Sequence, residues 1–93
     1  MKTTKEMGVS HAEFFSVLPR LLGRDEYQVR GNTVVHEHDG KCIRFTLGPE
    51  LQREIASIRL PVTRIEVSLD GFSEPEQREF MKRFDLRFRR GGG

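Results

Sequence analysis

The sequence predicts an α+β domain in which helices pack on one face of an antiparallel sheet. Two capping-box patterns begin helices, two turn signals join three alternating segments, and a further alternating segment follows. The expected order is α-β-β-β-α-β-α. Because 93 residues suffice for one core only, we expect a single domain over residues 1–93. Its ordered core should span about residues 9–90, with flexible termini at 1–8 and 91–93.

The first helix is expected to begin at Ser10. Ser10 and Glu13 have the capping-box spacing, and apolar residues recur at helical spacing from Phe14 onward. Gly23 suits the left-handed conformation that ends a helix. Pro19 lacks a backbone donor, so it predicts a kink or a short separate turn up to residue 22.

A three-stranded meander is predicted between residues 27 and 47. Asp39-Gly40 is a strong two-residue hairpin signal and Gly31-Asn32 is a weaker one. Counting outward from both turns gives one consistent register. The face expected to meet the helices carries Tyr27, Val29, Val34, His36, His38, Ile43, Phe45 and Leu47. The other face is mostly polar and is expected to face water.

Residues 49–60 are expected to form a short helix, because Pro49 suits the first helical position and Pro61 would end it. Leu51 and Ile55 would share one side of this helix. The next segment, VTRIEVSLDG, alternates between apolar and polar residues and predicts a fourth strand with one side buried.

The last helix is expected to begin at Ser73, which repeats the capping-box spacing with Glu76. Aromatic residues at helical spacing give this helix a buried stripe. The predicted core combines residues from every main element. It comprises Phe14, Leu18, Val29, Val34, Phe45, Ile65, Val67, Phe80 and Phe84.

Composition favours an intracellular, cytoplasmic protein that does not associate with membranes. The first residues are polar, and no apolar run is long enough for a signal peptide or a membrane span. The single cysteine, Cys42, excludes an internal disulfide and fits a reducing compartment. No nucleophile motif, phosphate loop or paired carboxylates are present, so neither an enzyme nor a cofactor is indicated.

Positive charge is concentrated near the carboxyl terminus. From residue 78 to residue 90, six cations face two acidic residues, an excess of four charges on a chain whose net charge is +2. The leading hypothesis is a small binding or adaptor domain whose basic last helix, with the polar sheet face, engages an acidic protein or nucleic acid. The candidate residues are Arg83, Arg87, Arg89 and Arg90. The same cations would also be stabilised by the helix dipole, without any partner.

The chain ends in LRFRRGGG. This ending resembles the diglycine tails of ubiquitin and the sulfur-carrier proteins. The resemblance implies a tail in which Gly92 and Gly93 enter an adenylating enzyme and the terminal carboxylate is activated. Those proteins lead into the tail from a strand, whereas a helix is expected here. Alternation from Asp85 onward leaves a strand as the alternative.

His36 and His38, with Cys42 nearby, raise the alternative of a small metal-binding protein. The register places both histidines on the apolar face and the cysteine on the other, and two ligands are too few for a closed site. We therefore expect His36 to be a core histidine that is hydrogen-bonded to the hydroxyl of Tyr27. His38, next to the turn, should be solvated.

Overall fold

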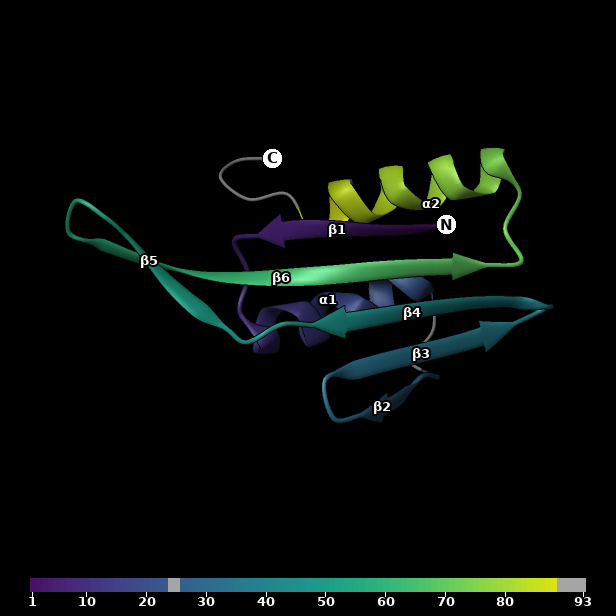
Figure 1. The fold of residues 1–93 in the computed structure, drawn as a ribbon, viewed down its shortest axis with the longest axis horizontal. Helices are drawn as coiled ribbons and strands as arrows, with labels where there is room; N and C mark the ends of the chain where they lie inside the picture. The colour runs from purple at the N-terminus through teal and green to yellow at the C-terminus, as the bar shows by residue number, and fades with distance from the viewer. Residues whose placement is uncertain (24–25, 89–93) are drawn as a thin grey trace.

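The computed structural model describes residues 1–23 and 26–88 and confirms the predicted α+β class (Figure 1). Both helices contribute to one core on one face of a six-stranded antiparallel sheet. The order along the chain is β-α-β-β-β-β-β-α, which differs from the predicted order at two places. The elements are β1 (Lys2–Met7), α1 (His11–Leu22), β2 (Gln28–Arg30), β3 (Thr33–His38), β4 (Lys41–Leu47), β5 (Leu51–Ile55), β6 (Ile58–Asp70) and α2 (Glu74–Arg87).

The predicted meander is confirmed with its register. In β2 and β3, Val29 lies opposite Val34, and in β3 and β4, Val34 lies opposite Phe45. The sheet continues through β6 to β1, in the order β1-β6-β4-β3-β2. β6 is an interior strand that pairs with β1, β4 and β5, and it supplies the buried Ile65 and Val67.

Residues 2–7 form β1, so the expectation of a flexible terminus over residues 1–8 was wrong. β1 pairs with β6 from Lys2 opposite Ser68 to Met7 opposite Thr63. The amino group of Met1 also donates a hydrogen bond of 3.1 Å to the carbonyl of Leu69. Backbone pairing with the long strand β6 orders this polar segment, although its side chains bury little apolar surface.

The prediction of a short helix within residues 49–60 was also wrong, because this segment forms β5 and the start of β6. β5 pairs with β6 from Leu51 opposite Val62 to Ile55 opposite Ile58, so both strands extend beyond the body as a hairpin. A helix this short would be marginal on its own, whereas the strand satisfies its backbone groups against β6. Ala56, at the hairpin turn, takes a positive φ of 56°.

Both helices begin as predicted, with reciprocal capping boxes. In α1 the backbone N–H of Glu13 donates to Ser10 Oγ at 3.0 Å, and Ser10 N–H donates to Glu13 Oε1 at 3.2 Å. Ser73 and Glu76 repeat the arrangement in α2. α1 is assigned as one helix through Pro19 to Leu22, and Gly23 ends it in the left-handed conformation.

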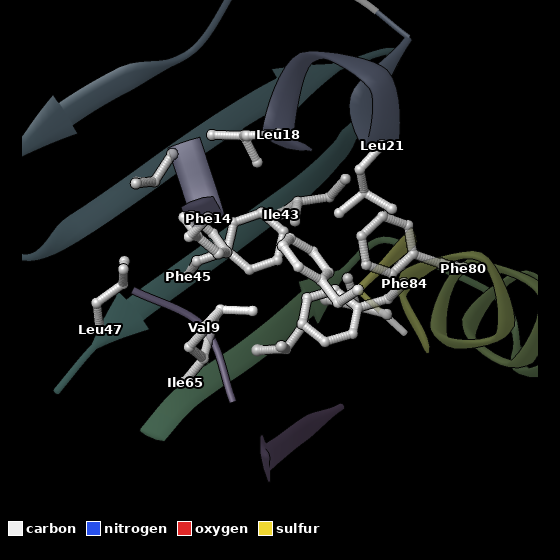
Figure 2. Close-up of a cluster of buried hydrophobic side chains, with 14 residues drawn as sticks. Val9, Phe14, Leu18, Leu21, Ile43, Phe45, Leu47, Ile65, Phe80 and Phe84 are labelled. Carbon is white, nitrogen blue, oxygen red and sulfur yellow. The ribbon is translucent and has the colours of Figure 1, made fainter. Parts of the chain in front are cut away.

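The core forms where side chains of α1 and α2 meet the inner face of β4 and β6 (Figure 2). Phe45 lies at its centre, with ring centroids 5.4 Å from Phe14 and 6.0 Å from Phe84. Eight of the nine predicted core residues are buried; Val29 is the exception, at 49% exposed. β2 is an edge strand of three residues, so the helices leave Val29 uncovered. No helix in the described part of the chain has the length and apolar character needed to cross a bilayer.

Candidate binding surfaces

The outer face of α2 presents the cations that the sequence singled out. Phe80 and Phe84 are buried on the inner side of this helix, which leaves Arg83 and Arg87 exposed one turn apart. The guanidinium of Arg83 lies 5.8 Å from the ring centre of Phe80. Among the ion pairs of the described residues, none includes Arg83 or Arg87. Arg89 and Arg90, the other two predicted binding residues, lie outside the described residues.

The acidic side chains of α2 are partly engaged elsewhere. Asp85 pairs with Lys5 of β1 at 3.4 Å, and Glu76 forms an ion pair with Lys41 of β4. The hydrogen bond from Lys41, assisted by the backbone and hydroxyl of Ser73, lowers the pKa of Glu76 to about 2. Asp85 and Glu76 therefore do not neutralise Arg83 and Arg87, whose charges face solvent.

The glycine tail of the carrier alternative, Gly92 and Gly93, lies outside the described residues. The segment before it is described: residues 85–87 belong to α2, and Phe88 caps this helix with its N–H on the carbonyl of Phe84 at 3.1 Å. The alternative of a strand beginning at Asp85 was therefore wrong for these residues. Phe88 is itself buried in the core at 7% exposure, so the chain is held by packing up to this position.

The two histidines do not form a metal site with Cys42. His36 is buried, and its Nδ1 lies 2.7 Å from the carbonyl oxygen of Glu26, which replaces the predicted partner, the hydroxyl of Tyr27. His38 stacks on His36 with ring centres 6.3 Å apart and lies 3.1 Å from the carboxylate of Asp39. Across residues 1–23 and 26–88, the structure contains no group of three or more His, Cys, Asp or Glu able to hold a metal ion.

Cys42 is a poor candidate for a reactive thiol. It lies on the open face of the sheet, the face away from the helices, between β3 and β6. Burial raises the pKa of this thiol, Glu37 raises it further, Arg44 opposes them and Asp70 adds to the increase. The thiolate, which is the nucleophilic form, is therefore disfavoured.

A hairpin arm, residues 51–62, is a surface that sequence analysis missed. It projects beyond the body at the end opposite the β3–β4 turn (Figure 1). One side of the ribbon carries apolar side chains that remain in water. Their exposed fractions are 59% for Leu51, 55% for Ile55, 58% for Ile58 and 37% for Leu60. The other side carries Gln52, Glu54, Arg59 and Pro61.

A hollow of about 400 Å³ lies at the base of this arm, on the open face of the sheet. Its apolar lining comes from Pro49, Leu51 and Val62, and its polar lining comes from Thr4, Glu6, Thr46, Arg64 and Glu66, with Gly48 between them. Glu6 accepts a hydrogen bond of 2.7 Å from Arg53 of the arm and lies 3.6 Å from Arg64. The arm's central cation is therefore neutralised within the chain.

The open face of the five strands β1, β6, β4, β3 and β2 is mostly polar and, taken together with the lining of the hollow, balanced in charge. Its strand residues carry four cations and four acidic groups: Lys2, Arg30, Arg44 and Arg64, and Glu6, Glu37, Glu66 and Asp70. No aromatic side chain lies among the strand residues of this face in the described chain. Comparisons with protein-family models, curated proteins and solved structures found no match to this chain. A proposal about function therefore depends on the chemistry of α2 and of the arm.

Proposed function

We propose that this chain is a non-enzymatic binding domain that engages an acidic protein segment through the outer face of α2. The observation that carries the proposal is the pair Arg83 and Arg87, which are exposed, adjacent and outside every ion pair of the described residues. Leu86, 54% exposed, lies one turn beyond Arg83 on the same surface. Two guanidiniums beside an apolar side chain suit a segment with carboxylates and at least one apolar residue.

A protein partner fits these groups better than a nucleic acid. Along α2 itself, the cations Arg78, Lys82, Arg83 and Arg87 are matched by Glu74, Glu76, Glu79 and Asp85. A phosphate backbone needs many cations along its path, whereas a short segment with a few carboxylates can be bound by two neighbouring guanidiniums. The open sheet face adds no net positive charge and no ring on which bases could stack.

The experiment compares two double variants that remove equal charge. Arg83→Gln/Arg87→Gln alters the proposed surface, and Arg30→Gln/Arg44→Gln alters exposed arginines on the open sheet face. The probe is a fluorescent peptide of Asp and Glu residues around one Leu, titrated by anisotropy at low and at moderate salt. A neutral peptide of the same length, a generic RNA and a generic duplex DNA are titrated in parallel.

Wild-type protein should bind the acidic peptide, more weakly at the higher salt concentration. Loss of two exposed charge contacts at about 0.5 to 1 kcal/mol each should weaken binding by roughly 5- to 30-fold in the α2 variant. The sheet variant should retain wild-type affinity. Equal losses in both variants, wild-type binding no tighter than to the neutral peptide, or tighter binding to RNA or DNA would each contradict the proposal.

A further inference from the structure

We propose that the hairpin arm is a self-association surface, and that its occupant is the arm of a second copy of this chain. In the proposed pair, a two-fold axis passes through the middle of the arms, so they run in opposite directions with their apolar sides facing. The tip of each arm, Ile55 and Ile58, then packs into the hollow at the base of the other. This inference is independent of the proposed role of α2.

The shape of the arm suits an isologous contact. Along β6 the alternation that turns Val62 toward the open face continues through Arg64, so the arm's apolar side and the hollow lie on the same face. The projecting side chains are at one end of that face and the hollow is at the other. A two-fold axis perpendicular to the length of the arms places the tip of one arm against the hollow of the partner. By symmetry, the partner's tip meets the hollow of the first copy.

Charge on this side of the arm does not oppose the contact. Arg53 is the one ionisable residue among the arm's six residues on this side, and its guanidinium is bound to Glu6 of the same chain at 2.7 Å. This side of the arm therefore suits an apolar partner better than an acidic one. The charged residues Glu54 and Arg59 lie on the opposite side, and they are 2.9 Å apart. They would remain in water when two arms pack face to face.

The exposed apolar side chains of the arm supply a large part of the area that a dimer needs, and neighbouring groups can supply the rest. The four apolar side chains leave roughly 400 Å² in water, as much as the largest apolar patch on an ordinary monomer. Two copies would bury about 800 Å² from these side chains, and a standard interface buries about 1,200 to 2,000 Å² in total. The stem of Arg53, Val62 and the rim of the hollow would supply the remainder. Pairing also gives each two-stranded arm the second layer that isolated hairpins lack.

A membrane is a poorer occupant for the same surface. Both edges of the arm carry backbone groups outside the hairpin's own ladder. Among the described residues, β5 pairs only with β6, and residues 58–62 of β6 pair only with β5. Hydrocarbon cannot satisfy such groups, so an open two-stranded ribbon does not enter a bilayer. In a dimer these edges stay at the rim, where water satisfies them.

The first test measures mass by sedimentation equilibrium at rising protein concentration. Wild-type protein should shift from the mass of one chain to that of two. Ile55→Glu should raise the dissociation constant by 100-fold or more, because it places an unpaired charge in the partner's hollow. Val29→Glu is the matched control, since Val29 is a strand residue of similar exposure far from the arm, and it should leave the dissociation constant unchanged. A wild-type protein that stays monomeric, or equal effects of both variants, would overturn the proposal.

A second test examines whether the tip of one arm lies against the base of the other. In a Cys42→Ser background, Leu51→Cys and Ile58→Cys place thiols at the base and at the tip of one arm. Within a chain these positions are about 13 Å apart, four residues along the ribbon, which is too far for a disulfide. Mild oxidation should therefore yield a covalent dimer on a non-reducing gel. A product that remains a single chain would refute the tip-to-base arrangement. Folding of the variant that carries both cysteines is checked by circular dichroism.

Discussion

Phe45→Ala tests whether the core is organised as described. Phe45 is fully buried in β4, where its ring meets Phe14 of α1 and Phe84 of α2. Val34 and Val67 flank it on the neighbouring strands. Truncation would therefore remove contacts that join both helices to the sheet, and the surrounding strands are held by their backbone pairing and cannot close the space.

The expected cost is about 3 to 5 kcal/mol, which combines lost burial with the cavity left behind. A chain of 93 residues has a free energy of unfolding of roughly 5 to 14 kcal/mol, so the variant would lose a large share of its stability. For a domain of this size, each kcal/mol corresponds to about 4 to 8 °C in Tm. The melting temperature should therefore fall by at least about 12 °C.

Urea unfolding monitored by circular dichroism gives the comparison directly. Leu86→Ala is the control, because Leu86 is 54% exposed on α2 and its truncation should cost less than about 0.5 kcal/mol. Both unfolding curves should keep the wild-type slope. An unchanged midpoint for Phe45→Ala, or a loss as large for Leu86→Ala, would show that the faces of the sheet have been assigned wrongly.

Three further variants test other features of the fold. Val34→Ala should cost about 2 kcal/mol in urea unfolding, whereas Val29→Ala, half exposed on the same face, should cost well under 1 kcal/mol; equal losses would mean that the edge strand is covered. Gly71→Ala should lower stability by at least about 2 kcal/mol, because φ is +80° there and the added methyl would overlap a carbonyl of the adjacent hairpin turn; a wild-type melting curve would refute this. Glu76 should titrate near pH 2 by NMR, because Lys41 favours its charged form; its stabilising contribution is therefore present above the ordinary pKa of 4.5 and fades toward pH 2. Lys41→Met should move this midpoint up toward 4.5, and an unmoved midpoint would exclude Lys41 as the cause.

Local chemistry in the sequence was enough to predict the helices and the meander. Ser10 and Ser73 begin the helices because their hydroxyls cap backbone N–H groups within the same few residues. Asp39-Gly40 determines which β3 and β4 residues face each other, since a two-residue turn leaves one register. The basic surface of α2 was predicted in the same way, because Arg83 and Arg87 are helical neighbours once the Phe stripe faces inward.

Features that depend on distant parts of the chain were missed. β1 is formed by a polar segment whose partner lies some sixty residues away, at Ser68, so nothing in its own composition indicates a strand. Val29 lies on the predicted side of the sheet, the side that packs against the helices. It belongs, however, to a short edge strand that the helices leave uncovered. Neither outcome follows from periodicity, because β1 depends on pairing with a distant strand and the exposure of Val29 depends on how far the helices cover the sheet.

The arm shows how two signals can compete within one segment. Leu51 and Ile55 are four residues apart, which suits a helix, but Ile58, Leu60 and Val62 continue the same apolar side only in a paired strand. Burial of apolar side chains does not favour the strand over the helix in the isolated chain, because the apolar side chains of the arm stay exposed. Backbone pairing with β6 decides the structure and leaves an apolar strip that the core does not use. A second arm would cover that strip, which connects the misread segment to the proposed dimer.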